Sequence, residues 1–167
     1  MILYKKIVFA LLPLGVMGLI FFFSSQPYEQ QDLRPSMNLY VPLDLLKPIL
    51  EPIRFTYYGE TISIETRGID GMLEFLIRKA AHLTVFFLLM VTMFLALNEN
   101  TNWRAGSKLL LSYVVTVFYA AFDEYHQSLT PGRTPYIGDV VLDSVGGFTG
   151  LLFIVLILWR KKPRTSR

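Results

Sequence analysis

Four long apolar stretches limit this 167-residue chain to the fold of a membrane protein. A lipid core about 30 Å thick is crossed by roughly 20 helical residues at about 1.5 Å each, and every stretch reaches that length. The composition agrees, because 53% hydrophobic and 17% charged residues are too apolar a mixture for a soluble domain of this size. The sequence therefore predicts one all-α domain over residues 1–167, a polytopic four-helix bundle with spans at about 5–24, 73–97, 107–128 and 139–160.

Basic residues gather on one side of this four-span arrangement. They are Lys5, Lys6, Arg104, Lys108 and the tail residues Arg160, Lys161, Lys162 and Arg164. Glu99 is the only acid in these short segments. Because Lys and Arg in short loops stay in the cytoplasm, we predict a multi-pass protein of the cell membrane with both termini cytoplasmic. These basic residues lie beside apolar segments, where their role is to orient a membrane protein. We therefore expect no nucleic-acid partner.

The sequence lacks both a recognisable signal-peptide cleavage site and cysteine, and each absence limits what this protein can be. The first apolar stretch could be a cleaved signal peptide, but it is long and no Ala-x-Ala site follows it, which favours a retained helix. The chain has no cysteine, which excludes disulfides, thiolate metal sites and cysteine nucleophiles.

The segment over residues 26–72 is predicted to be an insertion on the extracytoplasmic side. Residues 54–58 and 61–65 are rich in β-branched and aromatic side chains and flank Gly59-Glu60, which is typical of a small hairpin. Residues 39–53 are apolar but interrupted by three prolines, which favours short helical turns lying on the membrane surface over a fifth span.

Ionisable residues cluster at the outer ends of the predicted spans. Counting about 20 residues outward from the cytoplasmic ends places several polar side chains at one depth near the lipid boundary. They are Lys79, His82, Asp123, Glu124, Gln127, Asp139 and Asp143. Charge beside a lipid core is costly and rare unless it binds, pairs or reacts with something. Glycines at 146, 147 and 150 follow Asp143 on the last span and would let a neighbouring helix approach closely.

This cluster is the candidate functional site. The predicted catalytic residues are His82, Asp123, Glu124, Asp139 and Asp143. The predicted substrate-binding residues are Lys79, Gln127, Arg133, His126, Ser25 and Gln26. Acids and imidazoles here could perform acid–base catalysis or bind a divalent metal ion, and the cations could hold an anionic lipid headgroup. In a purely structural alternative, Asp123 and Asp143 pair with Lys79 and Arg133 and lock the bundle.

Four short motifs resemble those of VanZ-like proteins. They are Phe23-Ser24-Ser25-Gln26-Pro27, Arg78-Lys79-Ala80-Ala81-His82, Asp123-Glu124-Tyr125-His126-Gln127 with Pro131-Gly132-Arg133, and the stretch from Asp139 to Gly147. They occur in this order over most of the chain, which makes the likeness more specific than any single motif. One departure is Asp143, because the family often has Asn at that position.

The resemblance implies an integral membrane protein of the bacterial cell envelope, similar to proteins linked to resistance to teicoplanin, a glycopeptide with a lipid tail. The expected partners are membrane lipids and a lipid-linked cell-wall precursor or a lipoglycopeptide, and a homo-oligomer is compatible with the sequence. Three functions stay open: an enzyme acting on an anionic lipid-linked substrate, a non-catalytic binder or excluder of a lipophilic antibiotic, and a structural bundle. Transport is a weaker alternative because no inverted repeat is evident.

Overall fold

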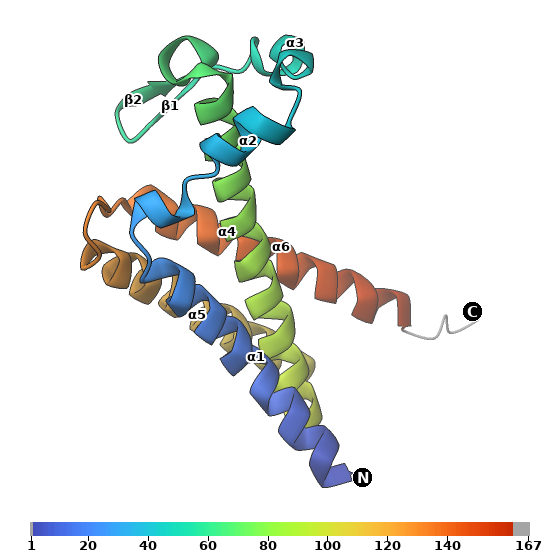
Figure 1. Cartoon of the computed structure of the whole chain (residues 1–167). Coiled ribbons are helices and arrows are strands. Elements are labelled where there is room, and N and C mark those ends of the chain that lie inside the picture. Colours follow the sequence, from blue (N-terminus) through green and yellow to red (C-terminus); the bar gives the residue numbers. More distant parts are fainter. Residues whose placement is uncertain (1, 162–167) are drawn as a thin grey trace, which may run out of the picture.

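A computed structural model describes residues 2–161, and four long helices dominate it (Figure 1). They are α1 (Ile2–Ser24), α4 (Ile64–Asn100), α5 (Ala105–Ser128) and α6 (Ile137–Lys161). Each helix is long and apolar enough to cross a membrane, which confirms the predicted all-α bundle of four spans. The predicted tail residues Lys162 and Arg164 lie outside the described residues.

Helix α4 is the centre of the bundle because it packs against each of the other three long helices. It begins well before the predicted start of the second span, because Ser63 caps it. The Ser63 hydroxyl accepts a hydrogen bond from the amide of Thr66 at 3.3 Å, and the Thr66 hydroxyl accepts one from the amide of Ser63 at 3.2 Å. The extra turns carry α4 beyond the bundle, with a kink at Gly68, where φ is 73°.

Glycines bring α6 against α4 and α5. A Cβ atom at Gly146 would lie 2.5 Å from the carbonyl oxygen of Leu83, and one at Gly150 would lie 3.0 Å from that of Phe87. A Cβ atom at Gly147 would meet the Cγ2 atom of Thr116 at 2.8 Å. Only glycine fits these approaches, so the close packing predicted for the last span is confirmed.

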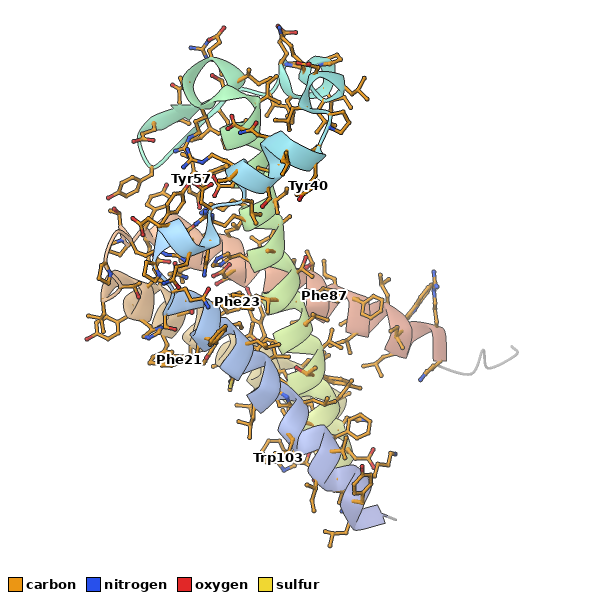
Figure 2. All side chains as sticks on the ribbon, in the orientation of Figure 1. Phe21, Phe23, Tyr40, Tyr57, Phe87 and Trp103 are labelled. Carbon is orange, nitrogen blue, oxygen red and sulfur yellow. The ribbon has the colours of Figure 1, made fainter. Side chains whose placement is uncertain are left out.

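The apolar core between the helices is small, and much of the apolar surface faces outward. One buried cluster contains Ile20, Phe86, Leu89 and Ala120. Phe21 and Phe23, labelled in Figure 2, are 46% and 55% exposed and project from α1. Such an exposed apolar surface is what helices facing lipid require.

The insertion between α1 and α4 is built from short elements. They are η1 (Tyr28–Gln31), α2 (Arg34–Tyr40), η2 (Leu43–Leu45), α3 (Lys47–Leu50), β1 (Phe55–Tyr57) and β2 (Glu60–Ile62). The strands form the predicted antiparallel hairpin, with Phe55 opposite Ile62. Its turn lies one residue earlier than predicted, at Tyr58 and Gly59, because both have a positive φ, 55° and 76°. Most of the insertion lies over the extended end of α4, remote from the start of α1 (Figure 1).

Candidate functional site

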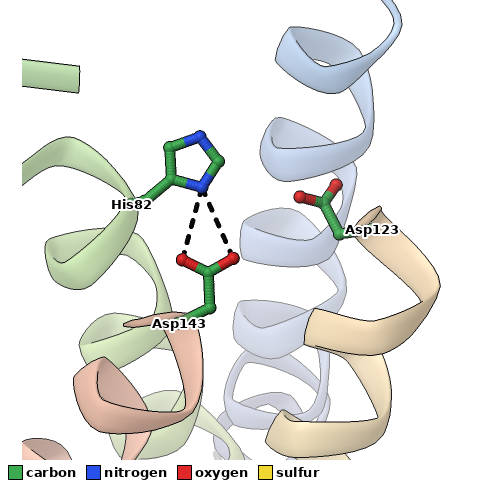
Figure 3. Close-up of side chains that lie close together, drawn as sticks. All are labelled: His82, Asp123 and Asp143. Carbon is green, nitrogen blue, oxygen red and sulfur yellow. Dashed lines mark hydrogen bonds and ion pairs between the residues drawn. The ribbon is translucent and has the colours of Figure 1, made fainter. Parts of the chain in front are cut away.

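Three ionisable side chains from three helices meet at the end of the bundle that bears the insertion. His82 comes from α4, Asp123 from α5 and Asp143 from α6 (Figure 3). One ligand atom from each lies within 4.8 Å of the other two. Both carboxylates are 1% exposed, and His82 Nδ1 lies 3.4 Å from Asp143 Oδ2. We call these residues the triad.

Helix α1 completes the surroundings of the triad. The Ser24 hydroxyl donates to Asp123 Oδ1 at 2.5 Å, and Gln127 Nε2 donates to Asp123 Oδ2 at 2.8 Å. Sequence reasoning named Ser25 and Gln26 here and missed Ser24. Ser25 is exposed and bonds to its own helix, through the carbonyl of Phe22 at 2.7 Å. The sequence carries no signal that distinguishes the two serines, because Ile20, one helical turn before Ser24, and Phe21, one turn before Ser25, are both apolar.

A second polar group lies beside the triad, where the hairpin meets the bundle. Lys79 of α4 forms an ion pair with Asp139 of α6, and the Tyr57 hydroxyl donates to the same carboxylate. Lys79 Nζ also lies 4.6 Å from the centre of the Tyr57 ring. Burial raises the pKa of Tyr57, and the hydrogen bond to Asp139 raises it further, so this phenol stays protonated. Tyr57 was not predicted, because its position depends on how the hairpin folds back.

Arg133, in the loop between α5 and α6, holds a polar network together. Its guanidinium donates to the side chain of Gln31 at 2.7 Å, to the carbonyl of Gln26 at 3.3 Å and to the side chain of Gln127 at 3.3 Å. Burial lowers the pKa of Arg133, and the positive charge of Arg78 lowers it further. Within residues 2–161 the guanidinium makes no ion pair, and its buried Nε has no partner.

The other two predicted site residues point elsewhere. Glu124 accepts a hydrogen bond from the amide of Tyr136 at 2.5 Å and so holds the loop before α6. His126 stacks on Phe21, with 4.2 Å between the ring centres. The structural alternative named the wrong ion-pair partners for Asp123 and Asp143. In the described structure, Asp143 faces His82 and Asp123 is held by neutral groups.

A cavity of about 510 Å³ lies between α1 and α4, beside the triad. Its apolar walls are Leu19, Ile20, Phe23, Leu33, Ile77, Ala81 and Val85. Its polar lining includes Ser24 and His82, together with Gln26, Gln30, Gln31, Glu74 and Arg78. The cavity therefore joins an apolar slot to His82 of the triad and to Ser24, which bonds to Asp123.

Comparison with known proteins assigns a family to this arrangement. A family model described as VanZ/LLP1 matches residues 9–159, which contain all four long helices apart from a few end residues. The protein belongs to the VanZ/LLP1 family. No curated protein and no solved structure matches the chain. The VanZ-like resemblance is thus confirmed, as is the class of multi-pass membrane protein.

Proposed function

We propose that this VanZ/LLP1 protein binds, and acts on, an anionic lipid-linked substrate of the bacterial cell envelope. The proposal is carried by one observation: His82 of the triad and Ser24, which bonds to Asp123, both line the apolar cavity. The cavity volume of about 510 Å³ falls within the range of small-molecule sites. Acid–base groups at the edge of an apolar cavity suit a substrate that has a lipid tail and a polar head.

The walls of the cavity support entry from the lipid phase. Leu19 and Phe23 of α1 and Ile77 of α4 line it and are also exposed on the surface of the bundle. In a bilayer these side chains would face acyl chains. A lipid tail could then slide between α1 and α4 without leaving the apolar phase, while its headgroup reaches the triad.

Arg133 is the best candidate to hold the headgroup. Its partners Gln26 and Gln31 line the cavity, and it makes no ion pair within residues 2–161. A guanidinium with an unused buried N–H suits a phosphate or carboxylate. Lys79 is less available, because Asp139 already neutralises it.

The predicted orientation agrees with this role. Lys5 and Glu99 form an ion pair at 3.0 Å, which joins the start of α1 to the end of α4 at the opposite end of the bundle from the triad. With both termini in the cytoplasm, the triad and the cavity would face outward. Lipid-linked envelope precursors and lipoglycopeptides are both met on that side.

Binding can be tested with the purified protein in lipid nanodiscs. Native mass spectrometry would compare a polyprenyl phosphate with the uncharged polyprenol. We expect Arg133→Gln to weaken binding of the phosphate by about 10–100-fold, the range of a charge-assisted hydrogen bond, and to leave the polyprenol unaffected. Arg104→Gln, at the other end of the bundle, is the control. Equal affinity of the wild type for phosphate and alcohol would refute the proposal.

Catalysis is tested separately by incubating the wild type and Asp123→Asn with envelope lipid precursors and analysing the products by mass spectrometry. A product formed by the wild type and lost in Asp123→Asn supports an enzyme.

The non-catalytic alternative is favoured by the internal bonding of the acids. Ser24 and Gln127 donate hydrogen bonds to Asp123, and Lys79 forms an ion pair with Asp139. It predicts binding that depends on Arg133 with no product, and loss of teicoplanin tolerance on deletion of the gene.

A further inference from the structure

We propose that His82, Asp123 and Asp143 bind one divalent transition-metal ion. One imidazole nitrogen and two carboxylate oxygens lie within 4.8 Å of one another, each from a different helix (Figure 3). Imidazole with carboxylates suits Zn²⁺ or Mn²⁺, whereas Mg²⁺ and Ca²⁺ prefer sets of oxygen ligands. Bonds to the metal of about 2.0–2.2 Å would draw the three atoms closer by roughly 1 Å.

An unpaired atom points independently to a missing partner. Asp143 is 1% exposed, and its Oδ1 is buried with no hydrogen-bond partner in the structure. His82 Nδ1 is 3.3 Å from this oxygen, but its hydrogen-bond geometry favours Oδ2. A buried acceptor without a donor costs about 1–3 kcal/mol, so it is rarely retained without a ligand. The free Oδ1 lies within the triad, where a cation would satisfy it.

The charge of the triad supports the same conclusion. Asp123 and Asp143 are both buried, and within residues 2–161 neither forms an ion pair with a lysine or arginine. The nearby Lys79 is committed to Asp139. Among the described residues, His82 is therefore the only basic group that faces these two buried carboxylates. Buried charges in proteins are usually paired or bind metals, and a divalent ion would neutralise both carboxylates at once.

The surroundings of the triad resemble the outer shell of a metal site. Ser24 and Gln127 each donate to one oxygen of Asp123, which orients the carboxylate and leaves a lone pair on each oxygen. Both His82 and Ser24 border the cavity. A metal held by three side chains keeps a coordination position open for water or a substrate oxygen. The proposed ion would thus lie between its protein ligands and the cavity.

The experiment measures metal binding directly and needs no substrate. The full chain, purified in detergent with a histidine-free tag and stripped of metal, is titrated with Zn²⁺, Mn²⁺ and Mg²⁺ by calorimetry. We expect one equivalent of Zn²⁺ or Mn²⁺ per chain and weaker binding of Mg²⁺. Loss of an outer-shell partner typically weakens metal binding about 10–100-fold, and we expect a weakening of this size for Ser24→Ala. His82→Gln and Asp123→Asn each remove a ligand, so they should weaken metal binding more than Ser24→Ala does.

Glu99→Gln is the matched control, because it removes a carboxylate from α4 at the opposite end of the bundle from the triad and should retain the metal. Circular dichroism shows whether each variant keeps its helices. If a triad variant does not fold, the visible spectrum of the wild type loaded with Co²⁺ decides instead, because mixed nitrogen and oxygen ligation gives bands that aqueous Co²⁺ lacks. No binding by the wild type, or equal binding by His82→Gln and Asp123→Asn, overturns the proposal. Neither result depends on the proposed lipid substrate.

Discussion

Replacing Gly146 by alanine tests whether close packing of α6 on α4 sets the geometry of the triad. The new Cβ atom would lie 2.5 Å from the carbonyl oxygen of Leu83 and 3.0 Å from its Cα. Both atoms belong to the backbone of α4, so no side chain can rotate away. The helices must separate by about 1 Å before the contact reaches an ordinary van der Waals distance.

This separation has two calculable consequences. Overpacking of a buried contact costs about 1–3 kcal/mol, and each kcal/mol lowers the melting temperature by roughly 2–4 °C in a protein of this size. The second consequence concerns the triad, because His82 directly precedes Leu83 and Asp143 lies one turn before Gly146. The distance of 3.4 Å from His82 Nδ1 to Asp143 Oδ2 would grow beyond hydrogen-bond reach.

The assay is thermal unfolding in detergent, combined with the titration of Zn²⁺. We expect Gly146→Ala to melt several degrees lower and to bind the metal more weakly than the wild type. Gly18→Ala on α1 is the control, because its Cβ atom would have nothing within 4 Å. It should melt at or slightly above the wild-type temperature, given the higher helix propensity of alanine. An unchanged melting temperature for Gly146→Ala would show that α6 does not pack on α4 as described.

Three further predictions concern the insertion and the orientation. Gly59→Ala, at a φ of 76°, should destabilise the hairpin by about 1–2 kcal/mol and make it more sensitive to limited proteolysis. Arg34 lowers the pKa of Asp32 to about 2 from 3.8, so Arg34→Gln should raise it again by NMR titration. The stabilising effect of this pair is present above pH 3.8 and is lost as the pH falls toward 2. Alkaline phosphatase fused after Glu65 should be active, because the insertion is predicted to lie on the extracytoplasmic side. An inactive fusion would reject cytoplasmic termini.

The sequence identified most of the residues that meet at the site but not how they pair. The four-residue spacing of Asp123 and Gln127 places them on one face of α5, and their hydrogen bond at 2.8 Å follows from that spacing. In the structural alternative, Lys79 was predicted to pair with Asp123 or Asp143. It pairs with Asp139 instead, because the packing of α6 on α4 places Asp139 nearest.

Two contacts at the site, those of Ser24 and Tyr57, were not predicted, and for the same reason. Ser24 and Ser25 are neighbours in a helix and differ by 100° in direction, so only the packing of α1 on α5 decides which one meets Asp123. Tyr57 lies in an insertion without a periodic pattern, and its contact with Asp139 depends on how the hairpin folds over the end of α4.

The amino-acid sequence by itself determined four membrane-length helices, the glycines that allow close packing and the common depth of the polar residues. These properties follow from length, apolar content and helical period, which are local along the chain. Only the tertiary structure decided which acid faces which base, because that depends on the rotation and separation of helices packed side by side. The triad of His82, Asp123 and Asp143 and the adjoining cavity between α1 and α4 belong to this second class.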